Sequence, residues 1–328
     1  MQFGRRRLLG LLGGSFAVTA LPALGQQAKL PRIGYLFSFV RSQGEHLWEA
    51  CRQGLRELGY VEGRNIVLEP RWADGRHERL PAMVAELVKL KVDVIVAAAT
   101  PANLAAKAGA GSIPVVMVAV GDPLQIGLVA SLNRPGGNIT GLTLLTPDLS
   151  GKRLQLVLDV LGRASRVALL INPENRSHEV FLAETRAAAG TLGVQLQAKQ
   201  ARNTAEIEHA LDFSRETRPD AAIVFDDPVL WSFRKQIVSQ FSRAKLPAVY
   251  GYSEFVDDGG LMSLGPDRID HYRRTARYVD RILKGDRPAE MPVERPTKFE
   301  LVINAKTARA QGLTLSQTLL LRADRVIE

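Results

Sequence analysis

Cysteine is nearly absent from this chain of 328 residues, which has only Cys51. A lone cysteine excludes an internal disulfide, and the periodic segment HLWEACRQGLREL around it predicts a small buried side chain. Aromatic residues make up only 6% of the chain, and its basic residues are scattered among acidic ones. No run of basic residues interleaved with aromatics indicates nucleic-acid binding.

Motifs for chemistry are also missing. The chain has no G-x-S-x-G nucleophile elbow, and its five histidines form no H-E-x-x-H and have no cysteine partner. The glycine-rich stretch 120–141 matches neither G-x-G-x-x-G nor G-x-x-x-x-G-K-[ST], so it does not predict a phosphate site. We therefore expect a binding protein rather than an enzyme, with no metal and no cofactor.

The N-terminus has the pattern of an export signal. Arg5, Arg6 and Arg7 precede an uncharged stretch from Leu8 to Leu24, and small residues precede an expected cleavage site after Gly25. GRRRLL also fits the twin-arginine pattern. A retained membrane anchor is the alternative, but a spanning helix needs about 20 apolar residues, and Pro22 and several glycines interrupt this stretch.

Cleavage after residue 25 would lower the formal charge from +9 to +6. It would also leave no cysteine near the new N-terminus for a lipid. We expect a periplasmic protein without an anchor, with a signal peptide at residues 1–25. A mature chain of roughly 300 residues is long enough to form two domains.

Short apolar runs alternate with longer amphipathic ones from residue 32 onward. This alternation predicts parallel strands covered by helices on both faces. The expected strands of the first α/β unit are 32–37, 65–73, 92–100 and 113–120, and its expected helices are 45–59, 79–91 and 101–111.

A second α/β unit begins after the glycine-rich stretch. Its expected helices are 150–162, 177–193, 204–216 and 229–245, with strands at 166–172, 194–201, 221–227 and 247–252. The chain ends with expected strands at 259–265 and 300–304 and helices at 270–284 and 305–312. This tail is too short for a third domain, so it must return to the first two.

We therefore predict two doubly wound parallel-sheet lobes with a ligand cleft between them. The first lobe would contain residues 30–143 and approximately 260–290. The second would contain 144–259 and approximately 291–328, and a hinge would include Asn138–Leu145. Ligands of such sheets bind outside the carboxyl ends of the strands.

Most of the candidate ligand-binding residues follow from that rule, because they stand at or just beyond the end of an expected strand, and Thr143 lies in the expected hinge. The candidates are Ser38, Phe39, Thr100, Pro101, Asp122, Thr143, Asn172, Asp227 and Tyr252.

Several of these candidates could instead serve only to stabilise the fold. Thr100 with Pro101 predicts an N-cap followed by the first helical residue, and the same helix start could bind a carboxylate. Asp122 could close a turn or pair with a ligand ammonium. Asp227 is typical of a helix start, which argues against a magnesium site at Asp226 and Asp227.

The chain resembles a known family in several segments. They are GLRELGYVEGRNI, IPVVMVAVGDPLQIGLVASLNRPGGNITG, GGLMSLGP and YVDRILKGDRPAEMPVERPTKFELVINAKTARAQGL. These resemble ABC-transporter substrate-binding proteins of the tryptophan/tyrosine type, which have the type I periplasmic binding-protein fold.

The resemblance implies a monomeric protein that captures a small molecule, such as an amino acid, and delivers it to an ABC permease. Phe39 or Tyr252 would then flank the ligand's side chain. A periplasmic sensory protein that docks on a receptor or kinase is the alternative, and an exported enzyme on the same scaffold is a third.

Overall fold

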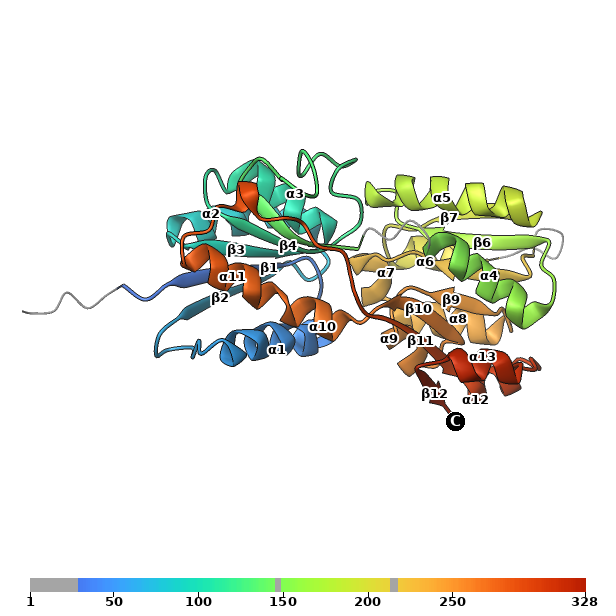
Figure 1. Ribbon diagram of the computed structural model, residues 1–328. Helices are drawn as coiled ribbons and strands as arrows, with labels where there is room; N and C mark the ends of the chain where they lie inside the picture. The colour runs from blue at the N-terminus through green and yellow to red at the C-terminus, as the bar shows by residue number, and fades with distance from the viewer. Residues whose placement is uncertain (1–28, 145–148, 213–217) are drawn as a thin grey trace, which may run out of the picture. The chain divides into compact units, whose positions relative to one another are not determined.

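The computed structural model describes residues 29–144, 149–212 and 218–328. Residues 31–328 form one compact unit that contains two sheets. We call each sheet with its covering helices a lobe (Figure 1). The signal peptide expected at residues 1–25 lies outside the described residues.

The sheet of the first lobe has five parallel strands in the order β2-β1-β3-β4-β5. The three inner strands are apolar and almost fully buried, as expected for parallel strands covered on both faces. The strands are β1 (Arg32–Phe37), β2 (Val67–Trp72), β3 (Val94–Ala98), β4 (Val115–Val120) and β5 (Ile139–Thr143).

Helices cover both faces of this sheet. On one face lie α2 (Leu80–Lys89) and α3 (Ala99–Gly109), and on the other lie α1 (Arg41–Glu57), α10 (Arg268–Arg273) and α11 (Thr275–Leu283) (Figure 1). Two short 3-10 helices, η1 (His77–Arg79) and η2 (Pro288–Glu290), also belong to this lobe. Late residues therefore complete the lobe that the early ones begin.

The second lobe has seven strands in the order β12-β11-β10-β9-β8-β6-β7. All neighbours are parallel except β10 and β11. The strands are β6 (Arg166–Ile171), β7 (Gln195–Gln200), β8 (Ala221–Val224), β9 (Ala248–Tyr250), β10 (Met262–Pro266), β11 (Phe299–Asn304) and β12 (Arg325–Ile327).

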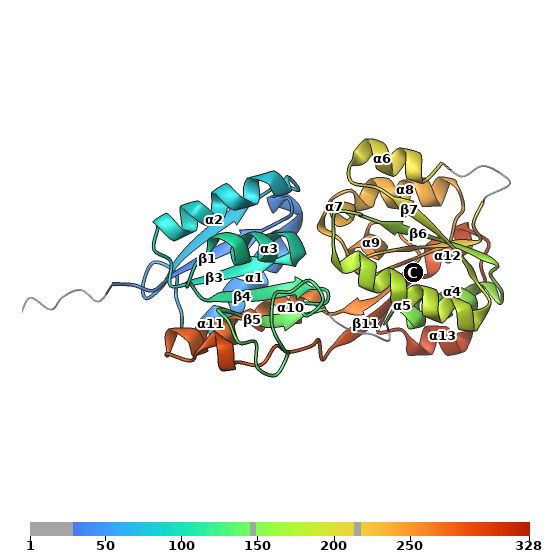
Figure 2. The ribbon, with the colours of Figure 1, turned by 90° about the horizontal axis from the view of Figure 1, so that it is seen from above.

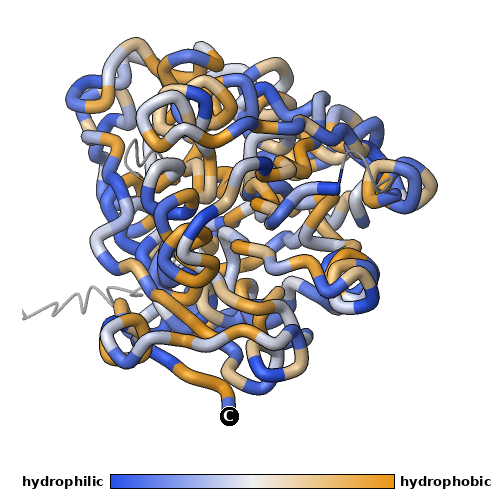
Figure 3. Tube along the Cα trace, turned by 90° about the vertical axis from the view of Figure 1, so that its right-hand side faces the viewer, coloured by the Kyte–Doolittle hydropathy of each residue, from blue (hydrophilic) through white to orange (hydrophobic). Residues whose placement is uncertain are grey.

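Figure 2 shows α6 and α8 on one face of this sheet and α4, α5 and α13 on the other. Many of the helices in Figure 3 carry both hydrophobic and hydrophilic segments, as expected for helices with one face against a sheet. The helices are α4 (Leu149–Leu161), α5 (Ser177–Leu192), α6 (Thr204–Ala210), α7 (Pro228–Ser232), α8 (Arg234–Arg243), α9 (Glu254–Asp257), α12 (Ala305–Ala310) and α13 (Gln317–Arg322).

Three hydrophobic clusters form the core. One fills the α2–α3 side of the first lobe, and another fills the α4–α5 side of the second. The largest cluster is continuous across both lobes, because it joins Phe39 of the first lobe to Trp231 of the second.

The chain passes between the lobes three times. It crosses between β5 and α4, between β10 and α10 at Asp267, and between η2 and β11. The last two segments are joined, because the Asp267 amide donates a hydrogen bond to the Lys298 carbonyl at 3.1 Å.

The predicted fold class is confirmed, with differences in detail. The glycine-rich segment contains a strand, β5, where we expected only a boundary and hinge. The expected helix 229–245 is two helices that meet at Phe233, and 270–284 is likewise divided at Arg274. The division into lobes stays a prediction, although β10 pairs within the second sheet rather than the first. No helix among the described residues is long and apolar enough to cross a membrane.

Candidate functional site

The two lobes touch at the carboxyl ends of their strands. At one contact, α3 of the first lobe meets α5 of the second, where the Thr100 and Ser177 hydroxyl oxygens lie 3.0 Å apart. Gly121, just after β4, packs against the same serine, and a Cβ on it would lie 2.5 Å from the Ser177 Cβ. Only glycine permits this close approach without movement of the neighbouring lobe.

A second contact joins α1 and the end of β1 to α7 and α9. The Phe39 ring lies edge-on to Trp231, with 5.1 Å between ring centroids. The Gln43 amide donates to the Ser232 carbonyl at 2.8 Å, and His46 Nε2 lies 3.1 Å from Glu254 Oε1. Both contacts therefore lie where the ligand of an open α/β sheet is expected.

Asn172 and Asp227 are brought together in the second lobe. Asp227 is the N-cap of α7, and its Oδ1 accepts from the amides of Val229 and Leu230 at 2.8 and 3.0 Å. The Asn175 amide donates to Asp227 Oδ2 at 2.9 Å, and the Asn172 amide lies 3.3 Å from both oxygens. Both oxygens of this fully buried carboxylate therefore already have donors.

His178 completes this network. Its Nδ1 accepts from the backbone N–H of Asn172 at 2.9 Å, so its Nε2 donates to the Asp226 carbonyl at 3.2 Å. Burial lowers the pKa of His178, which is consistent with a neutral ring that both accepts and donates. We define the Asp227 cluster as Asn172, Asn175, His178 and Asp227.

The other predicted polar residues form hydrogen bonds with backbone groups of their own lobe. Ser38 donates to the Ala98 carbonyl at 3.1 Å, and Thr143 donates to the Val120 carbonyl at 3.0 Å. Asp122 accepts from the amides of Leu124 and Gln125 at 2.9 and 3.1 Å, as an aspartate in a turn does. A direct ligand role for these residues stays a prediction.

The predicted helix cap at Thr100 is wrong. Helix α3 begins at Ala99 with Ala98 as its N-cap, which makes no side-chain capping bond. Thr100 and half-buried Pro101 therefore lie inside the first turn, and the threonine hydroxyl faces Ser177 of the other lobe. Ala99 has a φ of +70°, so the strand-to-helix turn occurs one residue earlier than the Thr-Pro pair indicated.

Aromatic rings and a buried cation gather beside the second contact. The guanidinium carbon of Arg268 lies 4.4 Å from the Trp231 ring centroid and 4.2 Å from that of Tyr252. Its Nη1 pairs with Glu254 Oε1 at 2.6 Å. Each of these residues stands just beyond the carboxyl end of β8, β9 or β10. We define the Arg268 cluster as Trp231, Tyr252, Glu254 and Arg268.

Charge sets the protonation of this cluster. Burial by itself would raise the pKa of Glu254, but the charge of Arg268 and a hydrogen bond with His46 bring it down to about 2. Glu254 is therefore ionised at neutral pH and balances the arginine. Burial raises the pKa of Tyr252 well above its ordinary value, so that phenol stays neutral.

Several buried polar atoms at this edge have no hydrogen-bond partner among the described residues. They include two donors, Trp231 Nε1 and Arg268 Nε, and two acceptors, Asp226 Oδ1 and Glu254 Oε2. A buried polar atom without a partner is costly, and its usual explanation is a missing partner such as a ligand or water. The edge could therefore bind a molecule that carries both donors and acceptors.

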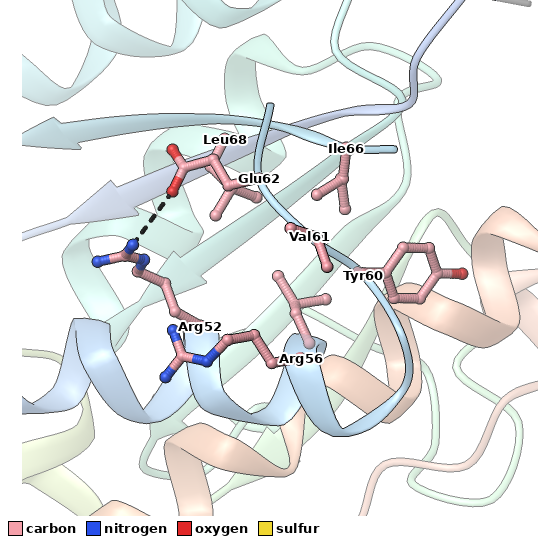
Figure 4. A pocket seen from close by; sticks show the side chains of 8 residues that line it. Arg52, Arg56, Tyr60, Val61, Glu62, Ile66 and Leu68 are labelled. Carbon is pink, nitrogen blue, oxygen red and sulfur yellow. Dashed lines mark ion pairs between the residues drawn. The ribbon is translucent and has the colours of Figure 1, made fainter. Parts of the chain in front are cut away.

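The surface also has a groove and a smaller pocket. A groove of about 610 Å³ runs beside the second contact and includes His46 and Glu254 in its lining. A smaller pocket of about 150 Å³ lies at the far end of α1 (Figure 4). Arg52 and Arg56 at its rim already pair with glutamates, at 3.4 Å to Glu62 and 2.5 Å to Glu49. This makes the smaller pocket a poor anion site.

Of the residues at the second contact and in the Arg268 cluster, the sequence-based candidates include Phe39 and Tyr252 but not Trp231 or Arg268. Trp231 lies one helical turn beyond the Asp-Pro start of α7, so extending the search by one turn would have found it. Arg268 had no such signal, because the expected helix began at residue 270. Within the described parts of the chain, no three His, Cys, Asp or Glu side chains are grouped for a metal.

The chain is similar over most of its length to known binding proteins. Residues 45–327 match the family described as ABC transporter substrate binding protein. A tyrosine-binding protein of Clostridioides difficile is 26% identical over 79% of this chain and 74% of its own.

Two solved structures have the same fold over 91% of this chain and all of theirs, each with 26% identity. A conserved domain protein of Vibrio cholerae has a TM-score of 0.86. A domain from Streptococcus pneumoniae, crystallised in complex with L-Trp, has a TM-score of 0.85.

Proposed function

Because this chain belongs to the family of ABC transporter substrate-binding proteins, we propose that it captures a free amino acid with an aromatic side chain. The amino acid would bind between the carboxyl ends of the two sheets. The protein would be exported, and it would deliver its ligand to an ABC permease. The family is one of binding proteins, so the chain is not an enzyme.

One observation carries the choice of ligand. The unmatched donors and acceptors of the edge are those that an amino-acid zwitterion would complete. Its carboxylate accepts hydrogen bonds and its ammonium donates them, and charge-assisted bonds of this kind are the strong ones. Neither a purely apolar ligand nor a simple anion would bind both the two unmatched donors and the two unmatched acceptors.

The aromatic preference is supported by the surroundings. Phe39, Trp231 and Tyr252 are all buried where the lobes meet, and aromatic rings prefer to pack edge-to-face or offset against one another. The tyrosine-binding relative and the L-Trp complex point to the same class of ligand.

Export and import are supported less directly. The basic, apolar and small-residue regions at residues 1–25 are those of a signal peptide. The family's description names an ABC transporter, which supports delivery to a permease. We expect uptake of labelled tryptophan by cells to fall when the gene is deleted, and to return when the full chain is restored.

Native mass spectrometry of protein purified without refolding tests the ligand class. We expect a 1:1 complex with an aromatic amino acid, lost after unfolding, dialysis and refolding, and regained when L-tryptophan or L-tyrosine is added. A co-purified sugar or nucleoside, with no binding of any amino acid, would reject the ligand class.

A further inference from the structure

Arg268 occupies an unusual position in the chain. It is the first residue of α10, directly after Asp267, where the chain leaves the second sheet for the first lobe. The Asp267 carboxylate caps this helix by accepting from the Asp270 amide at 3.0 Å. The backbone of Arg268 is therefore held at the junction of the lobes while its side chain is 92% buried in the second.

The guanidinium is fixed on three sides. Trp231 and Tyr252 lie within 4.4 and 4.2 Å of its carbon, and Glu254 binds its Nη1 at 2.6 Å. A guanidinium has five N–H donors in a rigid plane, so one carboxylate on Nη1 does not exhaust it. The Nε donor remains without a partner.

Trp231 carries the second unmatched donor. Its indole is fully buried, and its Nε1 has no hydrogen-bond partner among the described residues. An indole nitrogen can only donate, and so can a guanidinium nitrogen. Two neighbouring buried groups that can only donate require an acceptor, and a negatively charged acceptor forms the stronger bond.

We propose that Arg268 Nε and Trp231 Nε1 bind the carboxylate of the ligand and so determine that it is an amino acid rather than the corresponding amine. This rests on the proposed function. The start of α3 is the alternative seat, but Thr100 does not cap that helix and its hydroxyl already faces Ser177. Glu254 holds the guanidinium in place by accepting a hydrogen bond from its Nη1.

Calorimetric titration with L-tryptophan and with tryptamine, which lacks only the carboxylate, tests this directly. We expect the wild type to bind tryptophan about 100-fold more tightly than tryptamine, since stranding a buried charged donor has an effect of this size. Arg268→Gln should reduce this preference to about 5-fold or less. Its affinity for tryptophan should fall, while its affinity for tryptamine should change less than about 3-fold.

Arg234→Gln is the matched control. Arg234 also lies over the Trp231 ring, at 5.1 Å, but it pairs with Asp258 at 2.7 Å and belongs to α8. Its loss removes a second cation from the same indole and should leave the preference for tryptophan intact. Trp231→Phe removes the indole N–H donor while keeping a smaller aromatic ring. It should narrow the preference for tryptophan over tryptamine about 5-fold, so it tests the proposal even if the arginine variant does not fold.

The outcomes separate the two proposals. If the wild type binds none of tryptophan, tyrosine and the two corresponding amines, the proposed function is wrong, and so is this assignment. If it binds tryptophan and tryptamine equally, the function stands and the carboxylate assignment is wrong. Equal weakening of both ligands in Arg268→Gln and Trp231→Phe would also reject it, because the residues would then only shape the aromatic wall.

Discussion

The Asp227 cluster and the Arg268 cluster lie at the same edge of the second sheet, and both hold buried charge. Every oxygen of Asp227 has a donor, and those donors come from its own helix start and two neighbouring asparagines. In the Arg268 cluster, a donor of the arginine and an acceptor of Glu254 have no partner. The first cluster is complete without a ligand, and the second is not.

The two clusters differ in how far their polar residues lie from the end of the preceding strand. A polar residue directly after a strand is close enough to bond its own backbone, as Asp122 and Asp227 do. Trp231 lies a helical turn farther on, and its donor has no local acceptor. We infer that residues whose polar groups are not used in capping their own helix are the better ligand candidates.

The largest effect we predict is on stability. Asp227→Ala should lower the free energy of unfolding by about 3 kcal/mol, because it removes a helix cap and leaves buried amides of Asn172 and Asn175 without an acceptor. Chemical denaturation measures this, with Asp122→Ala as a milder comparison at about 1 kcal/mol. Tryptophan affinity of the folded fraction should be nearly unchanged in both variants.

The opposite result would reverse the comparison between the clusters. An Asp227→Ala protein that is as stable as the wild type but binds tryptophan more than about 30-fold more weakly would make Asp227 a ligand contact. It would then be the partner of the ammonium, and the Asp227 cluster would belong to the binding site.

A pH effect of intermediate size arises in the helix that carries Arg268. Burial, with the nearby charge of Arg274, lowers the pKa of His271 from 6.5 to about 3. The unfolded chain therefore takes up a proton below pH 6.5 while the folded protein does not. Stability from this group is complete above pH 6.5 and is lost as the pH falls toward 3.

The substitution His271→Leu should abolish that loss. At pH 7.5 we expect a free energy of unfolding within about 1 kcal/mol of the wild type, since the neutral ring is buried among packed side chains. At pH 5 the variant should be about 2 kcal/mol more stable relative to wild type than it is at pH 7.5. Parallel stability curves for the two proteins between pH 7.5 and 5 would contradict the buried, neutral state.

A smaller effect is expected where the lobes meet at Gly121. The substitution Gly121→Ala places a methyl group 2.5 Å from Ser177, so the lobes must separate slightly. We expect about a 10-fold loss of tryptophan affinity with little change in unfolding free energy. Gly190→Ala is the control, because a Cβ there meets nothing within 4 Å. It should leave tryptophan affinity unchanged, while the higher helix propensity of alanine inside α5 raises the free energy of unfolding by at most about 1 kcal/mol. A stability loss without an affinity loss would show that this contact serves folding only.

The smallest effect should come from the rim of the Arg268 cluster. His46 is 41% exposed where it meets Glu254, and exposed pairs contribute little. His46→Gln should change tryptophan affinity less than about 3-fold at pH 7. A loss greater than about 10-fold in the same titration would show that this pair, rather than the buried aromatic rings, holds the lobes together.

The fold could be predicted from the sequence because its signals are local. Apolar strands such as Val94–Ala98 and Val115–Val120 alternate with amphipathic helices, and that pattern alone indicates a doubly wound sheet. Strand β12, an exposed edge of three residues, and β5, hidden in a glycine-rich segment, had no such signal. Both depend on pairing with residues distant in the sequence.

The candidate site could be predicted only in part. Phe39 and Tyr252 stand at strand ends, where the rule for open sheets places a ligand. Arg268 reaches the same place from a crossing segment, and its partner Glu254 is bridged to His46, 208 residues away. The position of Arg268 depends on the second crossing of the chain, and the Glu254–His46 contact depends on how the lobes meet. Composition and periodicity show neither.

A crystal structure of the protein with L-tryptophan tests the central claim most directly. We predict that the amino acid lies at the carboxyl ends of both sheets, with its carboxylate within about 3.2 Å of Arg268 Nε and Trp231 Nε1. A carboxylate bound instead at the start of α3 beside Thr100, with both donors of the Arg268 cluster still unmatched, would contradict it.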